Sequence, residues 1–325
     1  MREAAGSRCR TVFVGAVEEG KRCLEALLRE GEPIAGAVTL KEAWAVRTSG
    51  AVPFDDLAER HAFPLLKVRD LNHPMNVERL RSLEPDLILA IGWTRLLGPD
   101  VLAMPRFGCV GFHASLLPRY RGRAPVNWAI INGEGETGNS MIYLDGGVDT
   151  GDVIAQRRIE IAYEDTCETL YAKVAASAIE MLREHLPALK TGSAPRHRQD
   201  ASRATVMPRR RPEDGEVDWS RSARALYDWV RALTHPYPGA FTFCDGRKIF
   251  VWRASEGVEG GGGTPGEVLG IEPGTGVVVA TGGGSLRLTR IQPEGGDEDR
   301  ADLAAGRLGL RAGARFSPAG IGGAS

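Results

Sequence analysis

The stretch TVFVGAVEEGKRCLEALLREGEPIAGAVTL, residues 11–40, places a helix-period segment between two apolar runs. The runs at 11–16 and 33–40 are typical of buried strands, and EEGKRCLEALLREG, residues 18–31, is typical of an amphipathic helix. The same order recurs in DDLAERHAF, PLLKV, NVERLRSLE and DLILAIGW. Strands that alternate with helices and are apolar along nearly their whole length predict a mostly parallel sheet with helices on both faces.

The pattern changes in the second half of the chain. Residues 191–214 carry Gly, Pro and many arginines without apolar periodicity, which is typical of a linker. Beyond them, one helical segment precedes β-type runs separated by Gly-rich turns, and Asp245-Gly246 is a hairpin signal. We therefore predict an α/β protein with a Rossmann-like domain over residues 1–190, a linker, and a smaller OB-like barrel with one helix over residues 215–318.

Composition narrows the class of protein. The net charge of -1 over 325 residues gives no broadly basic surface for RNA or anionic membranes, although a local patch is compatible with it. No stretch approaches the roughly 20 apolar residues of a membrane span. We expect a cytoplasmic protein without a metal site, and the sequence leaves its oligomeric state open. The cysteines, which we expect to be small buried hydrophobes, are Cys9, Cys23, Cys109, Cys167 and Cys244.

Several catalytic fingerprints are absent from the sequence. The turn after the first predicted strand reads GAVEEGKR, which lacks the GxGxxG of dinucleotide sites, and no GxxxxGK[ST] occurs. HExxH and GxSxG are also missing. These absences argue against nucleotide, metal-hydrolase and serine-hydrolase chemistry.

A histidine and an aspartate-rich loop remain as candidates. His113 ends the predicted strand GCVGFH, at the sheet edge where ligands of parallel sheets bind. The loop LDGGVDTGDVIAQ, residues 144–156, holds Asp145, Asp149 and Asp152 among glycines. A carboxylate that orients and charges an imidazole suits proton transfer or oxyanion stabilisation. The alternative from the residues alone is that His113 caps a strand and the aspartates form turns.

Basic residues follow the histidine in SLLPRYRGRAP. Arg119, Arg121 and Arg123 flank Tyr120 and suit a phosphate or carboxylate ligand. A solvated loop is the competing interpretation.

The motif FHASLLPRYRG, followed at a fixed distance by DGGVDTGD, resembles the folate-dependent formyltransferase family. That family includes methionyl-tRNA formyltransferases and bacterial amino-sugar N-formyltransferases. The resemblance runs from TVFVGAVEEG to LGLRAGARFS and includes EVDWSRSARALYDWVRALTHPYPGAFT. It implies a Rossmann-like domain that binds formyl-tetrahydrofolate and transfers its formyl group to an amine.

The resemblance also implies site residues. It implies that the family's catalytic histidine is His113 and that its catalytic aspartate is Asp149, 36 residues further on. The pterin is expected between two loops, formed by Gly92, Trp93, Thr94, Arg95, Leu96 and Leu97, and by Leu144, Asp145, Gly146, Gly147 and Val148. The residues expected to contact the acceptor are Gly111, Ser115, Arg119, Tyr120, Arg121 and Arg123.

Gly111 departs from the family pattern, which has Asn at this position. Loss of one oxyanion donor typically costs roughly 2.7–4 kcal/mol of transition-state stabilisation. Another donor could replace the amide, with Asn127 a candidate by chemistry alone; the enzyme could be slower; or Gly111 could widen the site for a larger acyl donor. A non-catalytic folate or nucleotide binder is a further alternative, against which the retained His113 and Asp149 argue.

The prediction of the acceptor rests on weaker sequence signals. The forms IGWTRLL, RYRGRAPVNW and THPYPGAFT are more similar to the sugar branch, so we expect an amino sugar or sugar nucleotide in preference to methionyl-tRNA. The run Arg209-Arg210-Arg211 favours tRNA phosphates instead, unless it is a solvated connector. An RNA-binding module built on the C-terminal barrel is a third possibility.

Overall fold

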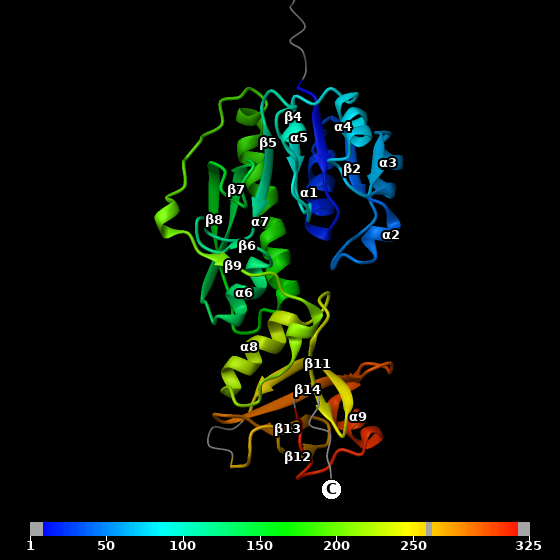
Figure 1. Ribbon diagram of the computed structural model, residues 1–325, viewed down its shortest axis with the longest axis vertical. Coiled ribbons are helices and arrows are strands. Elements are labelled where there is room, and N and C mark those ends of the chain that lie inside the picture. Colours follow the sequence, from blue (N-terminus) through cyan, green and yellow to red (C-terminus); the bar gives the residue numbers. More distant parts are fainter. Residues whose placement is uncertain (1–8, 258–261, 318–325) are drawn as a thin grey trace, which may run out of the picture. The chain divides into compact units, whose positions relative to one another are not determined.

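The computed structural model describes residues 9–257 and 262–317, and its contacts divide the chain into two units (Figure 1). The first unit comprises the described residues up to Pro125, with Glu136–Glu160 and Tyr171–Pro208. The second comprises Val126–Gly135, Ile161–Leu170 and the described residues from Arg209 onward. The predicted boundaries at 190 and 215 do not include these two excursions, and residue 318 lies outside the described residues.

The first unit contains a seven-stranded sheet in the order β3-β2-β1-β4-β5-β7-β8. The first five of these strands are mutually parallel, and β7 and β8 add an antiparallel edge, so the predicted mostly parallel α/β domain is confirmed (Figure 1). The strands are β1 (Thr11–Val14), β2 (Ile34–Leu40), β3 (Leu65–Val68), β4 (Leu87–Ala90), β5 (Cys109–His113), β7 (Glu136–Tyr143) and β8 (Val153–Glu160).

Helices cover both faces of this sheet, as the apolar strands require. Phe13 belongs to one core cluster with residues of α1 and α7, whereas Val12 and Val14 belong to another with residues of α4 and α5. Alternate residues of β1 thus pack into two separate cores, one on each face of the sheet. The helices of this unit are α1 (Glu18–Arg29), α2 (Glu42–Ala45), α3 (Asp55–His61), α4 (Pro74–Arg81), α5 (Pro99–Leu102) and most of α7 (Cys167–Leu189). Nearly all of α6 (Pro125–Ile131) belongs to the second unit.

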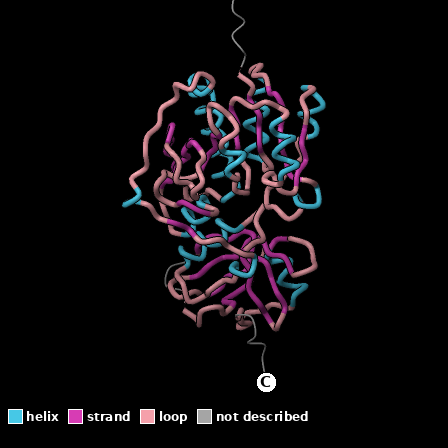
Figure 2. Tube along the Cα trace, turned by 45° about the horizontal axis from the view of Figure 1, so that its top comes forward, coloured by secondary structure: helices cyan, strands magenta, loops and turns pink. Residues whose placement is uncertain are grey.

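The segment predicted as a linker makes specific contacts in its first part. β9 (Val206–Met207) pairs with β6 (Arg121–Gly122), and the backbones of His197 and Val153 exchange hydrogen bonds of 2.9 and 2.8 Å. Residues up to Pro208 therefore pack within the first unit (Figure 2). Two short 3-10 turns, η1 (Ala201–Arg203) and η2 (Pro212–Gly215), complete the segment.

The second unit contains an antiparallel sheet in the order β10-β11-β14-β13-β12, with β15 paired to β14. The predicted hairpin turn is confirmed, because Asp245 and Gly246 connect β10 to β11 with φ of 47° and 73°. Phe316 donates to the carbonyl oxygen of Gly266 and Ser317 to that of Phe243, so the end of the described chain bridges both edges of the sheet. The strands are β10 (Ala240–Cys244), β11 (Arg247–Glu256), β12 (Val268–Glu272), β13 (Gly276–Ala280), β14 (Ser285–Pro293) and β15 (Asp299–Arg300).

The prediction of a single helix in this unit is wrong. Besides α8 (Ala223–Leu233), the structure has α9 (Ala301–Leu308), whose few apolar residues are mostly alanines and give a weak periodic signal. In the described residues, no helix is long and apolar enough to span a membrane. All five cysteines are free thiols, and only Cys9 is not buried.

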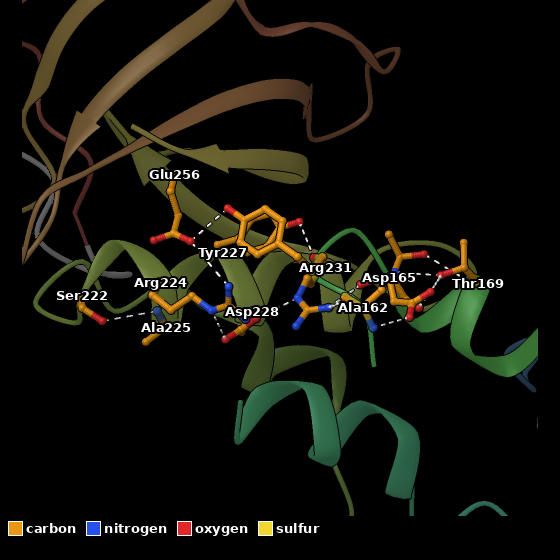
Figure 3. A network of polar contacts seen from close by, with 12 residues as sticks. Ala162, Asp165, Thr169, Ser222, Arg224, Ala225, Tyr227, Asp228, Arg231 and Glu256 are labelled. Carbon is orange, nitrogen blue, oxygen red and sulfur yellow. Dashed lines mark hydrogen bonds and ion pairs between the residues drawn. The ribbon is translucent and has the colours of Figure 1, made fainter. Parts of the chain in front are cut away.

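A buried polar network ties the segment before α7 to α8 (Figure 3). Arg231 and Asp228 are both about nine-tenths or more buried and form an ion pair of 2.7 Å. Arg231 also donates to the carbonyl oxygens of Ala162 and Asp165, at 3.1 and 2.6 Å. The network therefore holds residues 161–170 against α8 in the second unit.

Candidate active site

The parallel strands bring several loops to one edge of the sheet. Since β1 to β5 run in the same direction, the loops after β2, β3 and β4 lie at the same edge of the sheet as the end of β5, and β4 is the direct neighbour of β5. The chain switches sides between β1 and β4, which is where open α/β sheets bind ligands. His113 is the last residue of β5 and is 7% exposed.

Both ring nitrogens of His113 face oxygen atoms. Nε2 lies 2.6 Å from the carbonyl oxygen of Tyr120, and because a carbonyl oxygen only accepts, Nε2 carries a proton in this contact. Nδ1 lies 3.4 Å from Oδ1 of Asp149, longer than a direct hydrogen bond. The predicted pair is therefore close together, with room for the contact to tighten around a substrate.

Asp149 reaches the histidine from the loop after β7. Tyr143 pairs with Val110 near the start of β5, so the loop must fold back along β5 to bring Asp149 to its end. Asp149 has φ of 53°, a left-handed conformation that aspartate tolerates better than most residues. Its Oδ2 accepts a hydrogen bond of 2.8 Å from the backbone nitrogen of Gly122.

A residue that the sequence analysis missed supports this loop. Gln199 Nε2 donates to the carbonyl oxygens of Asp149 and Gly151, at 2.9 and 2.7 Å. Its Oε1 accepts from Nε and Nη2 of Arg121, at 3.2 and 2.7 Å. The expectation that Arg121 contacts the acceptor is thus corrected: its side chain is buried and contacts Gln199.

The other residues of the basic loop separate into two groups. Ser115 is buried and donates its hydroxyl to the carbonyl oxygen of Arg119 at 2.6 Å, so it supports the loop rather than facing a ligand. Tyr120 uses its backbone, accepting from His113 and donating to Thr205 Oγ1 at 2.8 Å. Arg119 and Arg123 are exposed.

Gly111 lies where β5 packs closely against β4. A Cβ atom at this position would lie 2.9 Å from the carbonyl oxygen of Ala90, and 3.1 and 3.3 Å from Cδ2 and Cδ1 of Leu144. Leu144 therefore fills the space beside Gly111, and the expected widening for a larger acyl donor is not present there. Asn127 does not replace an oxyanion donor in this arrangement, because its buried amide donates to the carbonyl oxygen of Ala232 at 2.6 Å.

The loop after β4 presents apolar and polar groups together. Asn72 fixes it by accepting from the Gly98 nitrogen and donating to the Leu96 carbonyl oxygen, at 2.6 and 3.0 Å. The Leu96 side chain is nevertheless 66% exposed, and the Trp93 Nε1 is buried without a hydrogen-bond partner in the described part of the chain. Of the remaining predicted residues in this loop, Thr94 is exposed, but Leu97 belongs to the core and is not available to a ligand.

The loop at residues 145–148 is exposed along its whole length. Asp145 orders it by accepting hydrogen bonds from the Gly147 nitrogen and the Thr150 hydroxyl, at 3.0 and 2.7 Å. Val148 is 49% exposed. An exposed valine and the exposed Leu96 are apolar groups that a flat aromatic ligand could cover.

The burial of two cysteines and the spacing of possible metal ligands bear on two other kinds of catalytic centre. Burial raises the pKa of Cys109 and of Cys167 to about 12, so neither is a thiolate nucleophile near neutral pH. Within residues 9–257 and 262–317, no three His, Cys, Asp or Glu side chains are grouped as a metal site.

Comparison with known families identifies the chain. Residues 10–186 match the family model described as formyl transferase, and residues 210–306 match the formyl transferase C-terminal domain. The chain belongs to the formyltransferase family. A similar protein is the methionyl-tRNA formyltransferase of Geotalea uraniireducens, which is 38% identical over 290 residues, covering 88% of this chain and 91% of that protein.

Two solved structures are similar in fold to this member of the family. HypX from Aquifex aeolicus, in complex with tetrahydrofolic acid, has a TM-score of 0.68 at 21% identity over 93% of this chain, and the chain spans only 48% of HypX. WlaRD, a sugar 3N-formyl transferase crystallised with dTDP and 5-N-formyl-THF, has a TM-score of 0.64 at 14% identity, covering 87% of this chain and 98% of that one. At these identities the two likenesses show the fold alone.

Proposed function

We propose that this formyltransferase takes its formyl group from formyl-tetrahydrofolate and transfers it to the α-amino group of methionyl-tRNA. The observation that carries the proposal is the contact between His113 Nδ1 and Asp149 Oδ1, 3.4 Å apart, beside two loops with exposed apolar side chains. A folate donor is supported by the tetrahydrofolate ligands named for HypX and WlaRD.

The residues present fit a folate. The pterin ring is flat, apolar on its faces and rich in hydrogen-bonding atoms at its edge. Leu96 and Val148 offer exposed apolar contacts from two loops, and Trp93 offers an indole N–H that lacks a partner in the described chain. We assign the donor to the loops at 92–96 and 145–148, and the bound donor supplies the formyl group.

His113 and Asp149 supply the remaining chemistry in this proposal. The acceptor amine must lose a proton as its nitrogen bonds to the formyl carbon, and the formyl oxygen gains negative charge. The bond between the formyl carbon and the folate nitrogen then breaks, and that nitrogen takes up a proton as tetrahydrofolate leaves. The Nε2–H of His113 stabilises the formyl oxygen once this N–H is released from the carbonyl oxygen of Tyr120, and the nearby carboxylate helps accept the proton of the amine. Because the Gly122 nitrogen already donates to Asp149 Oδ2, Oδ1 is the oxygen that remains for the His113 contact and for the proton.

The choice of acceptor rests on the relatives and on a local excess of positive charge. The Geotalea protein is named a methionyl-tRNA formyltransferase and is similar over most of both chains. Residues 191–211 contain six arginines and one carboxylate, Asp200, and all of these arginines except Arg210 are exposed. Neutralisation of tRNA phosphates by such a segment gives binding that weakens with salt. The amino-sugar acceptor expected from the local motifs has its support only at the level of the shared fold.

The test is a formylation assay with both acceptors. Purified protein is incubated with formyl-tetrahydrofolate and either methionyl-tRNA or a pool of nucleotide-linked amino sugars, and products are analysed by mass spectrometry. We expect one formyl mass on methionyl-tRNA, none on uncharged tRNA, and loss of the product with His113→Ala. Formylation of a sugar alone would show that the acceptor is an amino sugar and not methionyl-tRNA. Full activity of His113→Ala would overturn the assignment of the site.

A further inference from the structure

The main-chain oxygen of Tyr120 holds the imidazole of His113 in this structure. His113 Nε2 donates to that oxygen at 2.6 Å, while Nδ1 faces Asp149 Oδ1 at 3.4 Å. A carboxylate is the stronger of these two acceptors, because its charge strengthens a hydrogen bond. Without the Tyr120 oxygen, Asp149 would draw the proton of a neutral imidazole to Nδ1. The position of the Tyr120 oxygen therefore decides whether Nε2 keeps its proton.

Tyr120 holds this position in a backbone conformation that is unfavourable for its residue type. Its φ is 59°, in the left-handed region that bulky side chains rarely adopt. Such a conformation persists only where the surrounding contacts impose it, and residues of this kind are frequent at functional sites. The contacts around Tyr120 are therefore what keeps its oxygen at His113.

Thr205 makes contacts on both sides of Tyr120. Its Oγ1 accepts from the Tyr120 nitrogen at 2.8 Å, and its main-chain oxygen accepts from the Arg121 nitrogen at 2.8 Å. The first bond fixes the peptide before Tyr120, whose oxygen also accepts from the Ser115 hydroxyl at 2.6 Å. The second bond fixes the peptide that carries the Tyr120 oxygen. Because each peptide is planar, the two bonds together set the direction of that oxygen.

We propose that Thr205 is a positioning residue, whose hydroxyl keeps the Tyr120 oxygen at His113 and so keeps the proton on Nε2. The inference rests on the proposed function, because it takes the Nε2–H of His113 as the group that stabilises the formyl oxygen. When donor and acceptor are bound, the formyl oxygen replaces the Tyr120 oxygen as the acceptor of this N–H. Loss of the hydroxyl frees the peptide before Tyr120 to turn toward an ordinary conformation, and the proton then moves to Nδ1.

Two substitutions separate the hydroxyl of Thr205 from the shape of its side chain. Thr205→Val keeps the shape and loses the hydroxyl, whereas Thr205→Ser keeps the hydroxyl. Thr205 is exposed and its main-chain bonds remain in both variants, so both should fold.

The first measurement is the rate of formylation with saturating formyl-tetrahydrofolate and methionyl-tRNA. Thr205→Val should lower kcat by about 10- to 100-fold with little change in either KM, as expected when a catalytic group is displaced by about 1 Å. Thr205→Ser should keep a kcat close to that of the wild-type protein. Equal losses for the two variants, or a normal kcat for Thr205→Val, would overturn the inference.

The second measurement follows the imidazole itself and needs no substrate. In full-length protein with isotope-labelled histidine, NMR distinguishes a protonated ring nitrogen from an unprotonated one, and His113→Ala identifies the signals of His113. We expect a proton on Nε2 in the wild-type protein and in Thr205→Ser, and its loss from Nε2 in Thr205→Val. An unchanged Nε2 signal in Thr205→Val would overturn the inference, whether or not formylation is observed.

Ser82→Ala is the matched control, because Ser82 is an exposed residue of the same unit whose hydroxyl donates to the carbonyl oxygen of Arg79 at 2.8 Å, at the end of α4. This variant should change neither kcat nor the His113 signals, and thermal unfolding checks that each variant is folded. Absence of any product from the wild-type protein, with methionyl-tRNA and with amino sugars, would overturn the proposed function instead.

Discussion

The side-chain nitrogen of Gln199 donates to the main-chain oxygen of Asp149 at 2.9 Å, linking the segment before β9 to the loop that faces His113. The Gln199 side chain bonds to the main chain of Asp149 and not to its carboxylate, so its role is to position Asp149. We predict that Gln199→Leu lowers kcat by about 10²-fold with a small change in KM, because displacement of a catalytic group by about 1 Å has an effect of that size.

Two variants make this prediction specific. Gln199→Glu keeps an acceptor for Arg121 but cannot donate to Asp149, so its kcat should fall as well. Arg198→Gln changes the exposed neighbour, which belongs to the basic segment proposed for tRNA, so it should affect only the KM for methionyl-tRNA and leave kcat unaltered. A Gln199→Leu enzyme with normal kcat but a lower melting temperature would show that Gln199 supports the fold and does not position Asp149 for catalysis.

Asp149→Asn should lower kcat by about 10²- to 10⁴-fold, the usual contribution of general acid-base catalysis. Asparagine has the same shape and also tolerates the left-handed conformation seen here, so the fold should be retained. The measurement is the formylation rate under saturating donor and acceptor, with circular dichroism as the check on folding. Activity within threefold of wild type would remove Asp149 from the reaction.

Gly111→Ala should destabilise the first unit by about 1–3 kcal/mol, the usual cost of overpacking. The added Cβ would lie 2.9 Å from a backbone oxygen, that of Ala90, which cannot rotate away as a side chain can. Urea denaturation measures the effect. The double variant with Leu144→Ala should recover little, because the limiting contact is with the main chain; full recovery would mean that Leu144 sets the packing instead.

The larger features of the fold could be predicted because they leave periodic signals. The apolar runs at 11–16 and 33–40 become β1 and β2, and Asp245-Gly246 forms the expected turn, since each depends on a few neighbouring residues. His113 and Asp149 could be paired from strand-end reasoning and from the family motif, and the structure places them together.

The contacts of residues 191–208 could not be predicted in the same way. The side chains of Gln199 and Thr205 act through polar hydrogen bonds, and β9 has only two residues, so no apolar period marks them. The filling of space by Leu144 is likewise a matter of three-dimensional packing between residues distant in sequence. Short motifs near the site favour a sugar acceptor, whereas the similarity to a methionyl-tRNA formyltransferase extends over nearly the whole chain.

The buried ion pair in the second unit gives a prediction about stability (Figure 3). Arg231→Met should lower the free energy of unfolding by about 3 kcal/mol or more, because Asp228 would remain buried with less of its charge compensated. Arg224→Met is the comparison, since Arg224 pairs with the same carboxylate at 3.0 Å but has a side chain 44% exposed, and should cost about 1 kcal/mol or less. If chemical denaturation gave equal losses of unfolding free energy for the two variants, burial would not decide how much each arginine contributes to stability.

A pH-dependent effect on stability is expected at Glu19 in the first turn of α1. Burial raises the pKa of Glu19 from 4.5 to about 7. The folded protein therefore keeps this proton up to about pH 7, while the unfolded chain releases it near its ordinary pKa. Between these values the folded state binds more protons, so stability contributed by the protonated carboxyl is lost as pH rises. Glu19→Gln should thus raise the free energy of unfolding by about 1–2 kcal/mol at pH 8, a value reduced for the partial exposure of the side chain.

The gain should be much smaller at pH 5, where the folded protein already holds the carboxyl in its neutral form. Urea denaturation of wild type and Glu19→Gln at the two pH values gives the comparison directly. Glu18→Gln is the control, because Glu18 is the exposed neighbour and pairs with Arg22 at 2.9 Å, so it should show no gain at pH 8. A gain of the same size for Glu19→Gln at both pH values would mean that the glutamine packs better than the carboxyl, and that the proton held by Glu19 does not govern stability.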